Sequence, residues 1–475
     1  MPIIQPKIQL LDNSYKNEIF NEAKNILENL GVYIENEKVI ELFNNQGINH
    51  KEKRYYIPSD LVDKCLDNVP NEIKLYDREG KDYLSLKNDN VYFNPGSAAI
   101  YIVDESTNQR RHANTQDFIR FSKIMEHLKF IEAQSTAIIC QDIPLKSQDW
   151  HRLYICLSHC YKPIITGTFR KESFNIMREL LLACRLSEKD LAKKPLAIFD
   201  AAPSPPLKWS DLTSQAIIDG AKNMIPVEFV SMPLGGANAP ITLIGSITQH
   251  CAETLSGIVI SQLTKREAPI IWGGSPSMLD MKYGTAPMSA IESMMINIGD
   301  VEMGKYLNLP THAYMSVSDS FIPDAQAGLE SGMGILLGAL SGINVISGPG
   351  MLEFETTQSI KKLLIDNEIA GMAKRFISGI EDYGNPFASD ILNDYGKKEQ
   401  LLSHPTTKKL FRKELFFPSS IINRMSHSLW KNSGSPSIGK RASNEASKLA
   451  NKAPIKPIEN NLLNELDKIA SIYLK

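Results

Sequence analysis

Eight short apolar segments recur along this chain, and the stretches between them show the spacing of apolar residues expected for helices. The segments start 31 to 43 residues apart, and most end in small or polar residues. Their first residues are Val91, Ile131, Lys162, Pro195, Pro226, Pro269, Thr311 and Ile343. Near-continuous apolar strands that alternate with helices are typical of a parallel sheet covered on its faces. Eight such units over roughly 270 residues predict an α/β fold, a closed TIM (β/α)8 barrel.

The segments before and after this pattern predict two extensions of the barrel. Residues 1–90 predict an N-terminal helical extension, with helices near 15–30, 37–45 and 57–68. Residues 91–400 hold the barrel. Residues 401–475 form a C-terminal extension, which begins basic and aromatic-rich and closes with a predicted helix at 460–473. We expect this extension to pack on the barrel or on a partner.

Composition excludes several classes of protein. The chain is 43% hydrophobic and 22% charged with a formal net charge of −2, which is typical of a soluble globular protein. The balanced charge argues against a nucleic acid or a membrane surface as the main partner. No apolar run is long enough to span a membrane, and the N-terminus lacks the pattern of a signal peptide. We therefore expect a cytoplasmic protein whose six cysteines are reduced.

In (β/α)8 barrels the chemistry lies at the carboxyl ends of the strands, so the residues at the segment ends are the candidates for a site. No lysine ends a segment, which argues against Schiff-base chemistry. No cluster of His, Asp and Glu with metal-ligand spacing occurs at these ends, so we expect no catalytic metal. A glycine-rich phosphate loop is also absent in any obvious form.

The segment ends contain aromatic residues and turns of small residues instead. Aromatic faces around a site suit a quaternary ammonium, which cannot donate hydrogen bonds, although any one aromatic residue can equally be core filler. Glycine-rich turns let backbone N–H groups approach a ligand. The predicted substrate-binding residues are Phe169, Trp209, Trp272, Tyr314, Gly235, Gly236, Asn238, Gly273 and Gly274.

Three other polar groups need a functional and a structural interpretation side by side. Asp319 follows the seventh segment and is either functional or structural. Asp324 lies where a helix N-cap is needed, so we interpret it as structural. Cys156, His159 and Cys160 could hold a zinc ion, but no fourth ligand is nearby, and buried inert cysteines are the favoured interpretation.

Several long blocks carry a family resemblance. They are SMPLGGANAPITLIGSITQHCAETLSGIVISQL, APIIWGGSPSMLDMKYGTAPMSAIESMM, SVSDSFIPDAQAGLESG, GINVISGPGMLEFETTQSIKKLLIDNEIAGMAKR and HPTTKKLFRKELFFP. Over about residues 90 to 430 the chain resembles the trimethylamine methyltransferase family. The resemblance implies a TIM barrel that transfers a methyl group from a methylamine to the cobalt of a separate corrinoid protein. It also implies that this chain holds no cofactor tightly and acts on cobalamin carried by that partner.

The resemblance also points to one branch of the family. The archaeal trimethylamine enzymes contain pyrrolysine, whereas this sequence contains only the twenty standard residues, so it is similar to the non-pyrrolysine branch, whose type activity is glycine betaine methyl transfer. Many members of that branch read His-Asp where this chain has Ser347 and Gly348. The Ser347 hydroxyl is therefore a candidate donor toward the substrate, and Asp319 and Ser347 are the predicted catalytic residues.

These points predict methyl transfer from a quaternary amine, a betaine, to the Co(I) of a corrinoid protein. Co(I) is a strong nucleophile and a quaternary ammonium has a neutral amine as its leaving group, so the enzyme need only align the reactants. We expect an aromatic, proton-poor interior, with nothing to activate a tertiary amine. The alternatives are a different methylamine, or a non-catalytic barrel that senses quaternary amines. A homo-oligomer is also expected.

Overall fold

Within residues 2–395 and 400–474, which the computed structural model describes, eight parallel strands form one ring. In ring order they are β6 (Tyr92–Asn94), β18 (Val345–Ser347), β17 (Thr311–Tyr314), β15 (Ile270–Gly274), β13 (Val227–Ser231), β11 (Ala197–Ala201), β10 (Ile164–Thr166) and β9 (Gln134–Ser135). The ring closes where the N–H group of Ala133, just before β9, donates to the carbonyl of Phe93 in β6 at 3.1 Å. The predicted (β/α)8 barrel is confirmed, and each apolar segment contains one strand.

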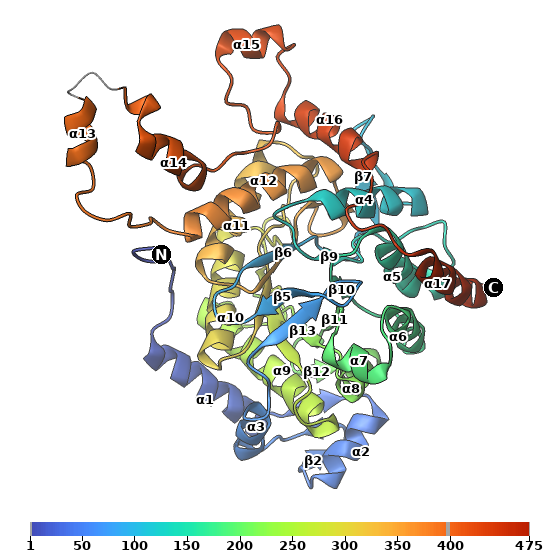
Figure 1. Ribbon diagram of the computed structural model, residues 1–475. Coiled ribbons are helices and arrows are strands. Elements are labelled where there is room, and N and C mark those ends of the chain that lie inside the picture. Colours follow the sequence, from blue (N-terminus) through green and yellow to red (C-terminus); the bar gives the residue numbers. More distant parts are fainter. Residues whose placement is uncertain (1, 396–399, 475) are drawn as a thin grey trace.

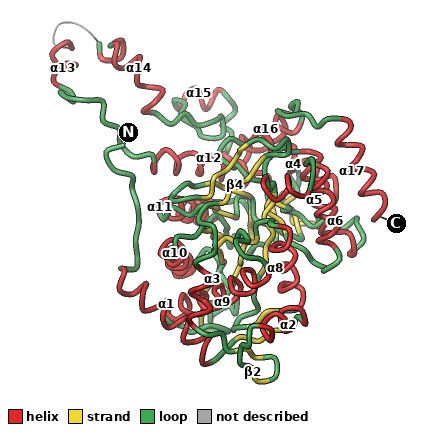
Figure 2. The backbone as a smooth tube through the Cα atoms, turned by 60° about the horizontal axis from the view of Figure 1, so that its bottom comes forward, coloured by secondary structure: helices red, strands yellow, loops and turns green. Residues whose placement is uncertain are grey.

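Helices surround the ring, as Figures 1 and 2 show. They are α4 (Thr115–His127), α5 (Gln148–His159), α6 (Ser173–Ala183), α7 (Glu188–Lys193), α8 (Asp211–Asn223), α9 (Leu243–Thr264), α10 (Ile291–Tyr306), α11 (Ala325–Leu340) and α12 (Ile360–Ile377). Polar caps fix where several of them begin. Asp324, for example, accepts from the N–H of Ala327 at 3.1 Å and caps α11, as predicted.

The N-terminal region contains the three predicted helices, α1 (Asn13–Asn29), α2 (Glu37–Asn45) and α3 (Ser59–Leu66). It also contains strands that the sequence did not predict. β1 (Val32–Ile34), β2 (His50–Lys51) and β3 (Arg54–Tyr55) form a small sheet with β12 (Lys208–Trp209). Helices α1 and α3 pack against α9, so this region extends the core on the outside of the barrel.

A hairpin made of β4 (Ile73–Tyr76) and β5 (Asp82–Leu86) plugs one end of the barrel. Its apolar side chains pack against residues that lie near the amino ends of the barrel strands, in a cluster of Ile73, Leu75, Leu84, Leu86, Ala133, Ile165, Ile198, Ile271 and Val345. In Figure 1, β5 crosses the middle of the ring. The interior is therefore closed at the amino ends of the strands and is approached from their carboxyl ends.

Short strands and turns line the open end. They are β7 (Tyr101–Val103), β8 (Arg110–His112), β14 (Leu234–Gly235), β16 (Ser277–Met278), β19 (Met351–Leu352), β20 (Thr357–Gln358) and the single turn η1 (Leu145–Ser147). β7 pairs with both β8 and β20, so the loop that follows the last barrel strand is tied to the hairpin that follows the first.

The C-terminal part of the chain first leaves the barrel and then returns to it. α13 (Ser389–Tyr395), η2 (Leu401–Ser403), α14 (Pro405–Glu414) and α15 (His427–Asn432) project from the body (Figure 2). α16 (Ile438–Ala450) then packs on α12 and α4, and α17 (Asn460–Tyr473) packs on α5 and α6.

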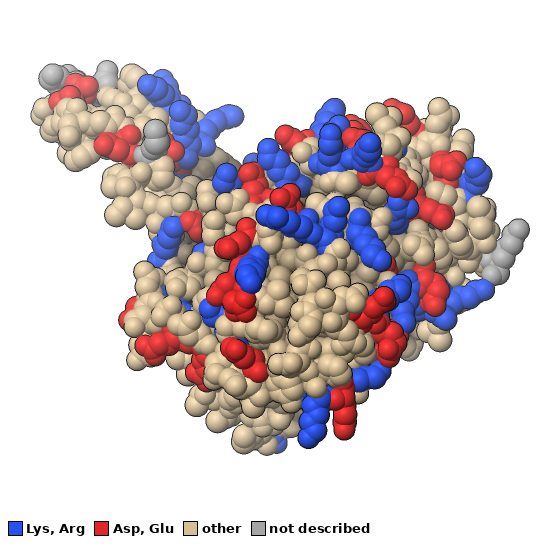
Figure 3. All heavy atoms as spheres, turned by 90° about the horizontal axis from the view of Figure 1, so that it is seen from below, with Lys and Arg blue, Asp and Glu red and all other residues tan. Residues whose placement is uncertain are grey.

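Both signs of charge are interspersed over the face shown in Figure 3, in agreement with the net charge of −2. Among the described residues, no helix is both long enough and apolar enough to cross a membrane.

Candidate active site inside the barrel

Side chains along a strand alternate between the barrel interior and the helix layer. Ile198, Ile271 and Val345 pack on the plugging hairpin, so they point inward. Side chains two positions further along these strands also point inward, and they lie nearer the carboxyl ends. The residues paired with inward-pointing residues in the sheet register point inward as well. This inner layer consists of Asn94, Asp200, Glu228, Gly273, His312, Tyr314 and Ser347.

A chain of polar contacts crosses the interior from β13 to β6, with an ion-pair contact between Glu228 and His312 followed by hydrogen bonds. Oε1 of Glu228 lies 2.8 Å from Nδ1 of His312, and Nε2 of His312 lies 2.7 Å from Oγ of Ser347. Ser347 donates to Oδ1 of Asn94 at 2.6 Å, and the Asn94 amide donates to the carbonyl of Pro95 at 2.7 Å. All of these side chains are buried, so the chain is held away from bulk water.

The direction of these bonds fixes where the protons lie. A side-chain carbonyl can only accept, so Ser347 uses its one proton on Asn94 and accepts from Nε2 of His312. Nδ1 of His312 faces the Glu228 carboxyl at 2.8 Å on the other side of the ring. The Ser347 hydroxyl, which we predicted as a donor toward the substrate, is thus committed within the protein.

Two further carboxyl groups face this interior. Asp200 on β11 is beside Glu228, and burial followed by repulsion from Glu228 raises the pKa of Asp200 well above its usual range. Glu355 enters from the turn between β19 and β20, and burial, with the charge of Asp319 adding to it, raises the pKa of Glu355 to about 8. With that pKa, Glu355 holds its proton at neutral pH and releases it when a cation binds nearby.

Tyr314 is the one predicted aromatic residue whose ring the structure places in the inner layer. Its ring stands edge-on to His312, with centroids 5.1 Å apart, and its hydroxyl lies 3.3 Å from Oγ of Ser97. Burial, together with the charges of Glu355 and Asp200, raises the pKa of the Tyr314 hydroxyl. Tyr314 therefore combines an aromatic face with a hydroxyl that keeps its proton.

A buried arginine lies beside Phe169, just beyond β10. The guanidinium carbon of Arg152 sits 4.3 Å from the centroid of the half-exposed Phe169 ring. Arg152 donates to the carbonyls of Thr136 at 2.6 Å and Gln148 at 3.2 Å, and among the described residues no carboxylate forms an ion pair with it. Burial lowers the pKa of Arg152 to about 10, and the charges of Asp149 and Asp200 partly oppose that shift. The arginine is a cation without a direct counter-ion.

The prediction of a proton-poor interior is therefore wrong. The sequence analysis missed Glu228, His312, Arg152 and Glu355. Glu228 and His312 lie within apolar strand segments, and the search was confined to segment ends. A polar residue placed two positions after an inward apolar residue was the signal that could have found them.

Trp272 and Trp209 lie outside the barrel interior, contrary to the prediction. Trp272 donates from Nε1 to the carbonyl of Asp300 in α10 at 2.8 Å, and Trp209 donates to Oγ of Ser256 in α9 at 2.8 Å. Both rings are fully buried in the core between the strands and the helices. The physical reason is strand phase, because Ile271 and Gly273 occupy the inward positions of β15 and turn Trp272 toward the helices.

We expect Trp272→Leu to lower the free energy of unfolding by about 2–4 kcal/mol, because it leaves a cavity beside α10. The affinity for an amine bound in the interior should stay within a factor of about two, since the ring does not reach it. Denaturant unfolding and calorimetric titration with glycine betaine measure the two effects. A folded variant with strongly weakened betaine binding would contradict this placement.

The predicted glycine turns contact protein rather than open space. A Cβ atom on Gly273 would meet Nδ1 of His312 at 2.9 Å, and one on Gly274 would meet Nε2 of His250 at 2.3 Å. Gly273 is therefore what lets His312 occupy the interior. Gly235 and Gly236 lie in the turn after β13, where Oδ1 of Asn238 accepts from the N–H of Leu234 at 2.7 Å and closes that turn.

Asp319, the other predicted catalytic residue, anchors a loop at the open end. Its carboxylate accepts from the N–H groups of Met288 and Ser289, both at 3.1 Å, and from Oγ of Ser289 at 2.6 Å. The structure does not bring it to Ser347. Its charge acts on Glu355, so it borders the site without supplying a free oxygen.

The cysteine pair gives no sign of a metal centre. Cys156 and Cys160 are fully buried, and burial raises the pKa of the Cys160 thiol to about 11. Sγ of Cys156 donates to the carbonyl of Ser135 at 3.4 Å. Among the residues that the structure describes, no group of three or more His, Cys, Asp or Glu side chains is placed to hold a metal ion.

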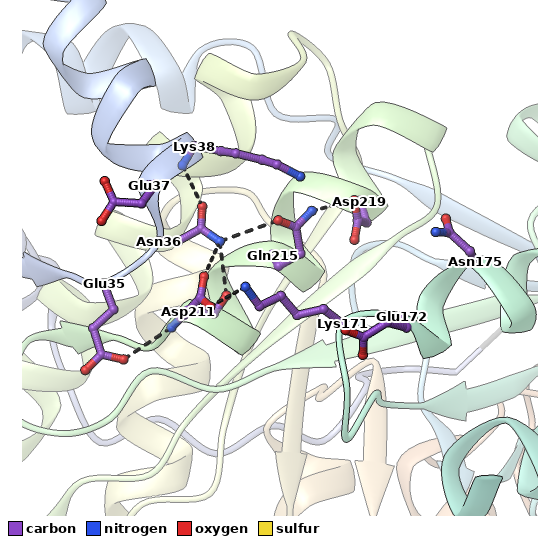
Figure 4. Close-up of a pocket in the computed structure, with 10 residues that line it drawn as sticks. All are labelled: Glu35, Asn36, Glu37, Lys38, Lys171, Glu172, Asn175, Asp211, Gln215 and Asp219. Carbon is purple, nitrogen blue, oxygen red and sulfur yellow. Dashed lines mark hydrogen bonds and ion pairs between the residues drawn. The ribbon is translucent and has the colours of Figure 1, made fainter. Parts of the chain in front are cut away.

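A surface pocket of about 590 Å³ lies elsewhere, between α2, α6 and α8 (Figure 4). Its polar groups satisfy one another. Asn36 donates to Oδ1 of Asp211 at 2.8 Å, Lys171 pairs with Asp211, and Gln215 donates to Asp219 at 2.8 Å. The pocket is outside the strand ring, so it does not belong to the candidate active site.

A plugged (β/α)8 barrel with acid and imidazole groups in contact inside it, toward its open end, is the architecture of a barrel enzyme. The chain belongs to the trimethylamine methyltransferase (MTTB) family, whose sequence model matches residues 3–471. The family resemblance seen in the sequence is thereby confirmed, and the protein is a member of a methyltransferase family.

Named relatives and one solved structure agree with this assignment. Trimethylamine methyltransferase MttB of Desulfitobacterium hafniense is 30% identical over 90% of this chain and 86% of that protein. A glycine betaine methyltransferase of the same species is 27% identical over 90% of this chain and 89% of its own length. The monomethylamine methyltransferase MtmB of Methanosarcina barkeri superimposes with a TM-score of 0.52 at 12% identity, covering 93% of this chain and 89% of that one, which supports the fold.

Proposed function

We propose that this protein transfers a methyl group from a quaternary amine, a betaine, to the Co(I) of a corrinoid carried by a separate protein. The observation that carries this proposal is the charge pattern of the barrel. Asp200, Glu228 and Glu355 offer carboxyl groups to a cation inside it, and Arg152 is a buried cation that forms no ion pair with any described residue. A betaine has one charge of each sign, which matches this pattern.

The reaction requires little of the protein beyond the placement of the reactants. The Co(I) electron pair attacks the methyl carbon and the C–N bond breaks. The bonding pair stays on nitrogen as a neutral tertiary amine, and the methyl group ends on Co(III). No proton is transferred, so the barrel has to exclude water and hold the N–CH3 bond along the approach from the open end. The carboxyl groups favour the ammonium that binds over the neutral amine that leaves.

A tertiary methylammonium is the second candidate substrate, and one observation favours it. Among the described residues, Asp200 Oδ1, Glu228 Oε2 and Glu355 Oε1 are enclosed oxygens without a hydrogen-bond partner. Such oxygens accept a hydrogen bond from N–H, which a protonated tertiary amine has and a quaternary amine lacks. The names of the relatives include both substrate classes.

The deciding experiment follows methylation of cob(I)alamin by its absorption spectrum, with glycine betaine, carnitine, choline or trimethylamine as the donor. We expect betaine-dependent methylation, and we expect betaine rather than trimethylamine to raise the melting temperature. Methylation from trimethylamine alone would select the tertiary amine. Binding of a betaine without methylation of either free or protein-bound cobalamin would indicate a sensor.

The affinity for betaine should depend on pH, and the raised pKa values of the carboxyl groups determine the direction of this dependence. Burial raises the pKa of Glu355 to about 8, so this group is largely protonated at neutral pH, and burial raises the pKa of Asp200 as well. A bound cation favours the ionised forms, so binding releases protons and affinity rises with pH until the free groups are ionised. From about pH 6 to about pH 8 we expect roughly tenfold tighter binding of betaine.

Calorimetric titration at several pH values, in buffers of different ionisation enthalpy, measures both the affinity and the protons released. An affinity that is flat over this range, with no proton release, would mean that the carboxyl groups do not face the cation.

A further inference from the structure

The turn between β19 and β20 has an unusual backbone. Glu353, Phe354 and Glu355 have φ values of +53°, +51° and +68°, so three consecutive residues other than glycine adopt the left-handed conformation. Residues with a Cβ atom rarely do so, and such strain is concentrated at functional sites, where surrounding contacts enforce it. Such a backbone therefore indicates that the turn holds a side chain in a particular position.

Contacts on the outer side hold its first two residues. Glu353 pairs with Arg110 at 3.0 Å, its N–H donates to the carbonyl of Ser320 at 3.0 Å, and its own carbonyl accepts from the Thr356 N–H at 3.0 Å. The ring of Phe354 stands edge-on to Phe321, with centroids 6.3 Å apart. These contacts hold the side chains of Glu353 and Phe354 and leave Glu355 as the third side chain of the turn.

That third side chain, Glu355, reaches into the barrel. Its Oε1 is enclosed and has no hydrogen-bond partner within the described part of the chain. The groups whose charges couple to it are Asp200 on β11, Tyr314 on β17 and Asp319 in the segment after β17, and all three are acids. Arg110 is engaged by Glu353 on the outer side of the turn. Within the described part of the chain no cation forms an ion pair with Glu355, so its carboxylate would be stabilised by a positive charge.

We propose that Glu355 is a specificity-determining residue, whose enclosed carboxylate contacts the positively charged ammonium group of the substrate. This proposal rests on the proposed function, because it concerns the amine bound in the same barrel. The proposal assigns recognition of the cation to one residue. It also gives the strained turn a role, because the turn holds the Glu355 carboxylate where a regular loop would not place it.

The test compares two ligands of the same shape. Glycine betaine and tert-butylacetate differ only in that the latter has a neutral carbon in place of the charged nitrogen. The ratio of their affinities, measured by calorimetry, reports recognition of the positive charge, and a merely structural change would weaken both ligands alike. The variants are Glu355→Gln, which keeps the shape and removes the charge, and Glu355→Gly, which also relieves the positive φ. Glu353→Gln is the matched control, because its carboxylate belongs to the same turn but is engaged by Arg110 and Thr357.

We expect the wild type and Glu353→Gln to prefer betaine strongly. In both Glu355 variants that preference should fall by about tenfold or more, while tert-butylacetate binds as before. An unchanged preference in folded Glu355 variants, or an equal loss for both ligands, would overturn the role of Glu355 and leave the proposed function intact. If the wild type binds neither ligand and methylates cobalamin from no quaternary amine, the proposed function fails, and this inference fails with it.

Discussion

Glycine betaine should bind the Arg152→Met variant about thirty-fold more weakly than the wild type, because a charged hydrogen bond worth about 2 kcal/mol is lost. Arg152 is fully buried beside Phe169 and lacks an ion pair among the described residues, so a substrate carboxylate is the partner it lacks. Choline carries the same ammonium group without a carboxylate, and its affinity should stay nearly constant.

Calorimetric titration of both ligands into both proteins measures the effect, and circular dichroism shows whether the variant is folded. Arg152→Lys serves as the charge-retaining variant and should recover part of the betaine affinity. Equal weakening of choline and betaine would mean that Arg152 supports the local backbone, through the carbonyls of Thr136 and Gln148, rather than the substrate.

Lys362→Met should lower the free energy of unfolding by about 3–5 kcal/mol, because it leaves a buried carboxylate without its cation. Nζ of Lys362 lies 2.6 Å from Oδ2 of Asp366 in α12, and both side chains are at most 2% exposed. Asp366 also accepts from the N–H of Gly350 at 2.7 Å, so this pair fixes the loop that follows β18.

The double variant Lys362→Met with Asp366→Asn separates the causes. The amide that replaces the Asp366 carboxylate is uncharged, so no buried charge is left unpaired, and its oxygen can still accept from the N–H of Gly350. Most of the lost stability should therefore return. Denaturant unfolding of the two single variants and the double variant gives the coupling energy. A double variant as unstable as the sum of its parts would show that the ion pair contributes no coupling.

The positions of the barrel strands could be predicted from the sequence, because strands buried on both faces form apolar runs that are bounded by polar residues. The same property hides which residues point inward. In β15 all five residues are buried, so nothing in the run distinguishes Trp272, which faces the helices, from Gly273, which faces His312. A phase error of one residue is enough to move a predicted site residue to the opposite side of the sheet.

The candidate site was harder to predict because tertiary packing assembles it. Arg152 comes from a helix, Glu355 from a turn whose backbone no local pattern requires, and Glu228 meets His312 only across the sheet. Tyr314 was found because it lies at a strand end and points inward. The plugging hairpin was missed although Ile73, Leu75, Leu84 and Leu86 are spaced as in half-buried strands, because the whole region before residue 91 was interpreted as a helical extension.

That hairpin has a kinetic consequence. With the amino end of the barrel closed, the amine and the cobalt of the proposed reaction share a single entrance, and an amine at the level of Asp200 and Glu228 lies beneath whatever covers the mouth. The amine must therefore enter before the protein that carries the cobalt docks, and the demethylated amine leaves only after that protein has departed. Steady-state kinetics should follow a compulsory order, with substrate inhibition when the cobalt carrier is in excess and occupies the mouth of the empty barrel.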